Sequence, residues 1–238
     1  GITFAIYDLA EVATTKAGVY VDILDAQVDA TKTGIYIELI NNQIRASLGG
    51  AYVEILLAVS PPDGDPTGLT ATAIDDTQID LAWTDGSTNE DGFKIERSPN
   101  GTTGWTLIHT TAADVESYSN TGLTEATAYY YRVYAYTSVG DSAYTTDDAL
   151  TYPAAPTSLD AVQAGSTQID LTWTDNSAGE TGFHIERSAT GAGGWSVIGT
   201  NAANDTTYSD TGLTPGATWY YRVGAYNATG DNYSNTDS

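Results

Sequence analysis

The chain has 238 residues, with 31 acidic residues against eight Lys and Arg, and its formal net charge is −23 at pH 7. A negative excess of this size repels phosphate, which argues against a nucleic-acid-binding protein. There is no cysteine, so neither a disulfide framework nor thiol chemistry is available, and no apolar run approaches the ~18 residues of a membrane-spanning helix. We expect no nucleic-acid partner and no membrane insertion.

A sixteen-residue repeat occupies the N-terminal part of the chain. Gly, an aliphatic residue or Ala, Tyr, an aliphatic residue, an acid and two aliphatic residues recur at 18–24, 34–40 and 50–56, and a weaker copy precedes them. Each unit is typical of a long strand, a turn and a shorter return strand. Fixed periods indicate an array, so this segment is predicted to be a β-meander or spiral.

Apolar side chains alternate onto both faces of the repeat strands. Along 19–24, for example, Val, Val and Ile face one way, and Tyr, Asp and Leu face the other. Sixty residues in a flat meander cover at most one face, so we expect a homo-oligomer or other subunits to supply the rest. The predicted assembly interface is Val19, Tyr20, Val21, Ile23, Ile35, Tyr36, Ile37, Leu39, Tyr52, Val53 and Ile55.

The remainder of the chain is duplicated. Residues 66–148 align with 156–238 at an offset of ninety without a gap, so that Trp83 matches Trp173. Each copy reads as about seven short strands separated by turn clusters, without helical periodicity, as in an antiparallel sandwich. In the first copy the strands are predicted near 67–73, 78–84, 92–98, 105–110, 117–120, 128–138 and 142–150.

The predicted fold is therefore all-β, with short Pro-rich connectors that favour a semi-rigid rod. Since the sequence contains no Met and begins at Gly1, we expect an initiator Met or a longer leader to precede it. At the other end, either the last strand is short or another module follows Ser238. The predicted organisation is a β-repeat assembly segment at 1–60, a Pro-rich hinge at 61–66, a first sandwich at 67–151, a linker at 152–156 and a second sandwich at 157–238.

Three motifs carry a resemblance to a known family. Ile79–Trp83, Gly92–Ser98 and Tyr129–Ala135, with their counterparts in the second copy, resemble bacterial-type fibronectin type III domains. The resemblance implies a seven-stranded immunoglobulin-like sandwich, and Leu123, six residues before Tyr129, is similar to the family's tyrosine corner.

The second copy departs from that pattern. Trp219 stands in the place of the corner tyrosine, so the hydrogen bond of this corner must be made by another group or is missing. The N-terminal repeats resemble the Val-Tyr-Val-Glu type repeats of tailed-phage virion proteins that also carry fibronectin type III domains.

The sequence offers little for catalysis. His109 and His184 lie in different copies, and neither has Ser, Cys or a second His at motif spacing, so we predict no catalytic site, no cofactor and no enzyme.

Calcium is the metal ion that the sequence comes nearest to suggesting. Acidic and polar residues alternate over 85–91, as calcium ligands often do, but Glu90 replaces the turn glycine of an EF-hand. The second copy offers only Asp175, Ser177 and Gly179, and Asp63 and Asp65 read as turn residues. We predict no metal site.

An outward aromatic face is the candidate binding surface, for a cell-surface glycan or a protein partner. Tyr with Arg is a combination that binding surfaces favour, although strand propensity alone also recruits Tyr. The candidate surface residues are Tyr130, Arg132, Tyr134, Tyr136, Tyr220, Arg222 and Tyr226.

These features favour a non-enzymatic structural protein of a phage virion, of the fibre or decoration type. Its N-terminal repeats would assemble into the particle and its sandwiches would be displayed outward, at the virion surface or outside the cell. One alternative is a subunit of an extracellular cell-surface filament or adhesin. The other is the spacer region of a secreted polysaccharide-degrading enzyme.

Overall fold

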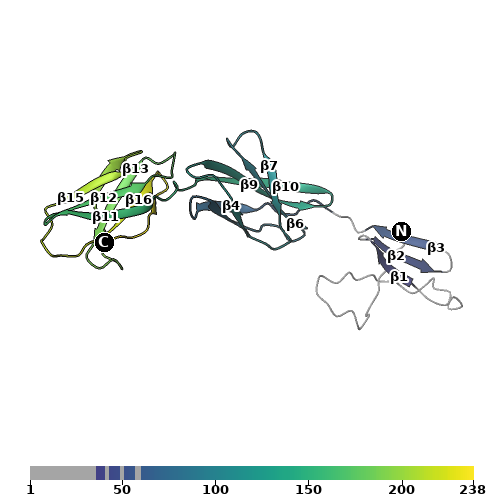
Figure 1. Ribbon diagram of the computed structural model, residues 1–238. Helices are drawn as coiled ribbons and strands as arrows, with labels where there is room; N and C mark the ends of the chain where they lie inside the picture. The colour runs from purple at the N-terminus through teal and green to yellow at the C-terminus, as the bar shows by residue number, and fades with distance from the viewer. Residues whose placement is uncertain (1–35, 41–42, 49–50, 57–59) are drawn as a thin grey trace. The chain divides into compact units, whose positions relative to one another are not determined.

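The computed structural model describes the backbone of residues 36–40, 43–48 and 51–56, and the backbone and side chains of residues 60–238 (Figure 1). Two compact units divide the chain, Gly1–Ala58 and Val59–Ser238. Every element in the described residues is a β-strand, which confirms the all-β prediction. Within them there is no helix that could span a membrane.

The first unit contains an antiparallel three-stranded sheet. Its strands are β1 (Tyr36–Ile40), β2 (Gln43–Leu48) and β3 (Ala51–Leu56), in the order β1-β2-β3. Tyr36 of β1 and Tyr52 of β3 both pair with Ser47 of β2. The sixteen-residue period is therefore one strand and its return strand in this sheet.

The predicted assembly residues divide between described and undescribed positions. Six lie on these strands: Tyr36, Ile37, Leu39, Tyr52, Val53 and Ile55. The others, together with the earlier copies of the repeat, lie outside the described residues: Val19, Tyr20, Val21, Ile23 and Ile35. Their part in assembly stays a prediction.

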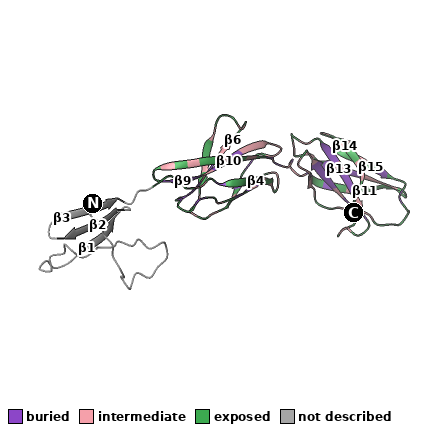
Figure 2. Cartoon of the chain, turned by 180° about the vertical axis from the view of Figure 1, so that it is seen from behind, coloured by how far each residue is buried: buried purple, intermediate pink, exposed green. Residues whose placement is uncertain are grey.

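The first sandwich packs a three-stranded sheet on a four-stranded one, and buried side chains of both sheets form one core. Figure 2 marks buried, intermediate and exposed residues along the chain. The smaller sheet has the order β4-β5-β8, and the larger one the order β10-β9-β6-β7. All seven strands lie close to their predicted positions: β4 (Thr67–Ala73), β5 (Gln78–Thr84), β6 (Gly92–Ser98), β7 (Thr106–Thr110), β8 (Ser117–Thr121), β9 (Ala128–Thr137) and β10 (Gly140–Leu150).

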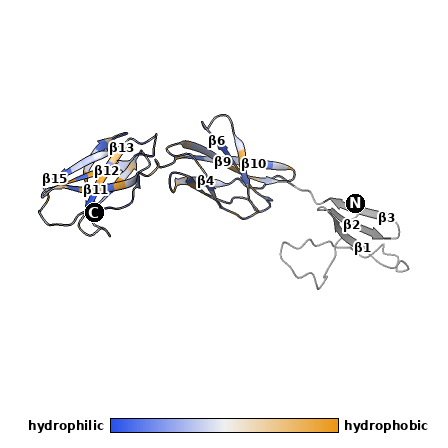
Figure 3. Ribbon diagram, in the orientation of Figure 1, coloured by the Kyte–Doolittle hydropathy of each residue, from blue (hydrophilic) through white to orange (hydrophobic). Residues whose placement is uncertain are grey.

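Alternation along the strands builds the core, and hydrophobic and hydrophilic residues accordingly alternate in Figure 3. On β9, Tyr131, Val133 and Ala135 are fully buried, because alternate residues of a strand face the same side of the sheet. They meet the inward residues of the opposite sheet, and the Trp83 and Phe93 rings pack at a tilt with centroids 5.6 Å apart.

The second sandwich repeats this plan around its own core. Its sheets have the orders β11-β12-β15 and β14-β13-β16-β17. The last strand is short, three residues against the eleven of β10. The strands are β11 (Thr157–Gly165), β12 (Gln168–Thr174), β13 (Gly182–Ser188), β14 (Ser196–Ala202), β15 (Thr207–Thr211), β16 (Tyr220–Tyr226) and β17 (Asp231–Tyr233).

The Pro-rich segment before the first sandwich is bonded to it. The Asp63 carboxylate accepts hydrogen bonds from Ser87 Oγ at 3.0 Å and from the amide and hydroxyl of Thr88 at 2.7 Å each. Asn89 Nδ2 donates to Ser60 Oγ at 2.9 Å. Ser87 and Asn89, two members of the alternating pattern over 85–91, are thus engaged by this segment.

Candidate functional site

An arginine on each sandwich is held between two aromatic rings. In the first sandwich the Arg132 guanidinium lies 4.7 Å from the Trp105 ring and 5.0 Å from the Tyr144 ring. Its Nε donates to Glu96, which also accepts the Tyr134 hydroxyl at 3.0 Å. Arg132 thus contacts two aromatic rings and one carboxylate of its own domain, and these contacts stabilise the sheet.

Lys94 extends this face along the sheet. Its Nζ lies 5.6 Å from the Tyr134 ring and 5.0 Å from the Tyr136 ring, and it pairs with Asp141 at 2.7 Å. The structure therefore brings three predicted surface residues, Arg132, Tyr134 and Tyr136, into one contact chain.

The second sandwich builds the same arrangement with other residues. The Arg222 guanidinium lies 4.6 Å from the Trp195 ring and 3.9 Å from the Tyr233 ring, and its Nε donates to Glu186.

At the position of Lys94 the second sandwich has His184. Its Nδ1 lies 2.6 Å from an Asp231 oxygen, and its ring stacks on Tyr226 at 4.1 Å. His109 of the first sandwich stacks on Tyr118 at 4.4 Å, so each histidine occupies an ordinary strand position beside a tyrosine ring.

Tyr130 and Tyr220 pack locally, against the turns that follow β6 and β13. A Cβ added at Gly101 would lie 2.9 Å from the Tyr130 ring, and one at Gly191 would lie 2.8 Å from the Tyr220 ring. Both glycines have a positive φ, so the turn geometry and the ring contact each favour glycine there. Whether these tyrosines bind a ligand stays a prediction.

Buried and half-buried tyrosines predict a loss of stability at alkaline pH. Burial raises the pKa of Tyr131 to about 12, and burial together with nearby carboxylates raises the pKa of Tyr134 and Tyr233 to about 12. In the unfolded chain a tyrosine titrates near ~10. Between about pH 10 and 12 the unfolded state has lost protons that the native state keeps, so the free energy of unfolding falls as pH rises.

Urea unfolding at pH steps through this window measures the effect. We expect the midpoint to be level below about pH 9 and to decline above about pH 10. A midpoint independent of pH across the window would contradict the prediction, and Tyr131→Phe should reduce the slope.

The tyrosine corner of the first sandwich is confirmed. The Thr124 amide donates to the Tyr129 hydroxyl at 2.9 Å. In the second sandwich Trp219 lies with its ring 4.4 Å from the Arg187 guanidinium, and its Nε1 has no hydrogen-bond partner among the described residues. The first domain has the equivalent stack, with the Arg97 guanidinium 4.9 Å from the Tyr129 ring, so the second domain keeps the stack and lacks the corner hydrogen bond.

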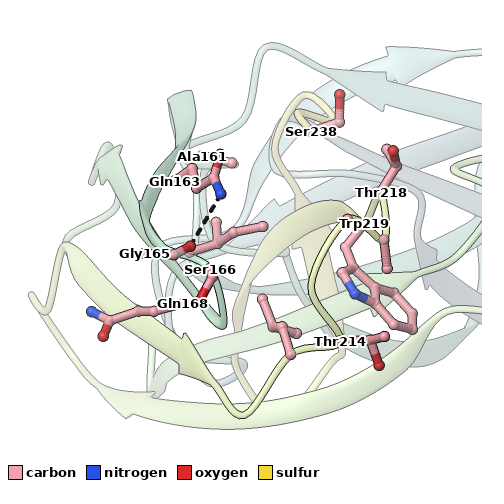
Figure 4. A pocket seen from close by; sticks show the side chains of 13 residues that line it. Ala161, Gln163, Gly165, Ser166, Gln168, Thr214, Thr218, Trp219 and Ser238 are labelled. Carbon is pink, nitrogen blue, oxygen red and sulfur yellow. Dashed lines mark hydrogen bonds between the residues drawn. The ribbon is translucent and has the colours of Figure 1, made fainter.

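A pocket of about 320 Å³ opens beside Trp219 (Figure 4). It lies between the β11–β12 turn, which contributes Gly165 and Ser166, and the loop before β16, which contributes Thr214. Gln163 Nε2 donates to the Gly165 carbonyl across one wall at 3.1 Å. All lining side chains are uncharged, which does not point to any particular ligand.

The junction between the sandwiches centres on Glu125, which sequence reasoning missed. Its carboxylate accepts hydrogen bonds from the linker amide of Ala154 at 3.1 Å, from Ser177 Oγ at 2.5 Å and from the Ala178 amide at 2.9 Å. Burial alone would raise the pKa of Glu125, but these hydrogen bonds outweigh it and lower the pKa below its usual value.

A second group of bonds ties the other side of the junction. Asn227 Nδ2 donates to the Thr151 carbonyl at 2.9 Å, Thr229 Oγ1 to the Leu150 carbonyl at 2.8 Å, and Asn232 Nδ2 to the Pro153 carbonyl at 3.0 Å. These donors follow β16, whereas Ser177 follows β12. The second sandwich is therefore bonded to the first sandwich and the linker through the loop after β12, through the turn after β16 and through Asn232 of β17.

Comparison with known proteins agrees with this architecture. The profile of the Fibronectin type III domain matches residues 64–147 and 154–237. Exoglucanase B from Cellulomonas fimi is 31% identical over 182 residues, which is 70% of this chain and 15% of the exoglucanase. Titin from Drosophila melanogaster is 27% identical over 186 residues, covering 72% of this chain and 1% of titin. The chain thus spans a small part of both relatives.

Among solved structures, a two-domain fibronectin type III segment of chicken tenascin matches with a TM-score of 0.46 and 16% identity, over 73% of this chain and 96% of that segment. Neither relative named above is a virion protein, and the likeness of the N-terminal repeats to phage proteins gains no support from them. The duplicated sandwiches are fibronectin type III domains in tandem, and the chain belongs to the fibronectin type III family.

Proposed function

We propose that this chain has a non-enzymatic structural role, in which its two fibronectin type III domains act as a stiff spacer. The observation that carries the proposal is the bonded junction around Glu125. A short Pro-rich linker limits how far two domains can reorient, but it does not hold them at one angle. Here a carboxylate from one domain is shared among three donors in the linker and the other domain.

Close packing at the same junction supports the proposal. A Cβ added at Gly179 would lie 2.4 Å from the Cβ of Ala126, so the loop after β12 approaches the first domain as closely as glycine permits. Charge-assisted hydrogen bonds are stronger than neutral ones, and Glu125 makes its bonds in a partly buried position. Reorientation of the domains would therefore break these hydrogen bonds or disturb this contact.

Distances between two labels test the stiffness. The chain has no cysteine, so Thr102→Cys and Thr214→Cys place one spin label on an exposed position of each domain. We expect a single narrow distance distribution, which Glu125→Ala broadens. Asp148→Ala removes an exposed carboxylate from β10 and should leave it narrow. A distribution already broad without Glu125→Ala would mean that the domains move independently, and would overturn the proposal.

Two settings suit such a spacer. Similarity to Exoglucanase B favours the spacer region of a secreted polysaccharide-degrading enzyme. The sixteen-residue repeats favour a subunit of a virion fibre, a decoration protein or an extracellular filament, with the repeats as the assembly device.

The mass in solution separates these settings. Light scattering would compare the full chain with a chain that begins at Ser60, which keeps the bonds of Ser60, Asp63 and Asp65 to the first domain. A trimer or larger full chain beside a monomeric shortened chain supports an assembly role for the repeats. Two monomers would contradict self-assembly and favour the enzyme spacer.

A further inference from the structure

Three carboxylates from two loops, the β5–β6 loop and the β7–β8 turn, converge at one end of the first domain. Asp85 follows β5, Glu90 precedes β6, and Asp114 lies in the turn between β7 and β8. One oxygen from each of the three lies within 4.8 Å of the others. Glu116 is adjacent, because its Oε1 accepts the Asp85 amide at 2.8 Å.

Glu90 is the unusual member of this acidic cluster, Asp85, Glu90 and Asp114. Its side chain is buried, with the residue only 8% exposed. Oε1 accepts the Asp114 amide at 3.2 Å, but Oε2 has no hydrogen-bond partner among the described residues. A buried carboxylate oxygen without a donor is costly, so this oxygen indicates a missing positive group.

Protein cations do not fill that role. In the part of the chain that the structure describes, no Lys, Arg or His forms an ion pair with the cluster. One oxygen from each of the three carboxylates lies within 4.8 Å of the others, and the Glu116 carboxylate is next to Asp85. The carboxylates therefore repel one another without a counterion.

The spacing suits one hard divalent cation. Calcium binds oxygen at 2.3–2.6 Å, so two oxygens on opposite sides of the ion lie about 4.6–5.2 Å apart and neighbouring ligands lie closer. Oxygens within 4.8 Å of one another fit that range. Carboxylates from two loops, with water completing the shell, suit the flexible coordination of calcium better than the strict octahedron of magnesium.

The second domain supplies an internal comparison. Asn204 occupies the position of Asp114 with nearly the same left-handed φ, 65° against 62°, and its amide donates to Glu180 Oε1 at 3.1 Å. Glu180 Oε2 also lacks a partner among the described residues. Thr206 replaces Glu116, so of the four equivalent positions in the second domain only Asp175 and Glu180 are charged.

We propose that Asp85, Glu90 and Asp114 form a calcium site in the first fibronectin type III domain, and that the second domain lacks an equivalent of comparable affinity. Occupancy would tie the turn between β7 and β8 to the loop that binds the Pro-rich segment through Ser87, Thr88 and Asn89.

Calorimetric titration of the chelator-treated full chain with CaCl2 tests the site. Measurement at about 0.15 M NaCl screens loose binding to the net negative surface. We expect one calcium per chain, with a dissociation constant on the order of 10⁻⁴ to 10⁻³ M, as in extracellular modules. In nuclear magnetic resonance spectra, amide shifts during the titration should centre on Asp85, Glu90 and Asp114.

Asp114→Asn is the decisive variant. It copies Asn204, and Asn tolerates a positive φ, so the fold should be kept while affinity falls at least about tenfold. Asp148→Asn makes the same charge change at an exposed position of β10 and should bind calcium normally. In the second domain, Asn204→Asp with Thr206→Glu should create a second site.

Three results would overturn the proposal. One is no saturable binding at millimolar calcium. Another is unchanged affinity in Asp114→Asn. The third is equal affinity for magnesium, which would refute the calcium assignment. Glu90→Gln is a second check. The neutral amide removes one ligand charge, so this variant should lose calcium binding, and it also relieves the repulsion among the carboxylates. The melting temperature of the variant should therefore no longer respond to calcium.

Discussion

Phe93→Ala should lower the free energy of unfolding of the first domain by about 3–5 kcal/mol. Phe93 is fully buried on β6, beside Ala135 of β9 and against the Trp83 ring. Truncation removes the transfer free energy of the ring and leaves a cavity between two hydrogen-bonded sheets that cannot easily close. A domain of this size has a total stability of only about 4–13 kcal/mol, so the variant lies close to unfolding.

Denaturant unfolding followed by tryptophan fluorescence measures this effect. Phe93→Leu keeps most of the side-chain volume and should lower the free energy of unfolding by less than Phe93→Ala. It replaces Phe93→Ala in the comparison with Leu107→Ala if Phe93→Ala does not fold. Leu107→Ala on β7 is the matched control, because Leu107 is 49% exposed and its truncation should cost less than about 1 kcal/mol. Equal losses for Phe93→Ala and Leu107→Ala would refute the assignment of Phe93 to the core.

Asp210→Ala should destabilise the second domain by about 3 kcal/mol. Asp210 is only 6% exposed, and one of its oxygens accepts both the Tyr221 hydroxyl at 2.9 Å and Arg187 Nη1 at 2.7 Å. Removing the carboxylate leaves a buried hydroxyl without its acceptor and a guanidinium without its counterion. An unsatisfied buried group costs more than the net value of the bond that was lost.

The first domain provides the control for this prediction. There Asn120 stands in the place of Asp210 and donates to the Tyr131 hydroxyl at 3.0 Å, with no ion pair to the arginine. Asp210→Asn should therefore keep a tyrosine contact and cost less than Asp210→Ala, and Asn120→Ala should cost about 1–2 kcal/mol. Thermal unfolding of the three variants gives the ranking. A loss in Asp210→Ala no larger than in Asn120→Ala would show that the ion pair contributes nothing.

The tyrosine corner is a contact that a short sequence motif predicts. Leu123 and Tyr129 are six residues apart, and the hydroxyl bond to Thr124 spans five residues, so a short motif contains the whole contact. In the second domain the sequence shows that Trp219 stands in the place of the corner tyrosine. It does not show that Trp219 stacks on Arg187, because Arg187 lies on a strand thirty-two residues earlier.

The aromatic faces show the same limit. Alternation along β9 placed Arg132, Tyr134 and Tyr136 on one face, and that part was predicted from the sequence. Trp105 and Tyr144, which enclose Arg132, lie near other strands and were missed. Which side chains meet across a sheet depends on strand order and register, neither of which a single strand encodes.

The sequence by itself determined the strands, the ninety-residue duplication and the inward residues of each sandwich, because alternation and turn chemistry act over a few residues. Only the tertiary structure decided the contacts among distant loops. Pairing β5, β6, β7 and β8 in two sheets brings Asp85, Glu90 and Asp114 together. Docking of the second domain gives Glu125 its donors. Such contacts join segments separated by more than twenty residues, and their geometry follows from packing the whole domain around its core.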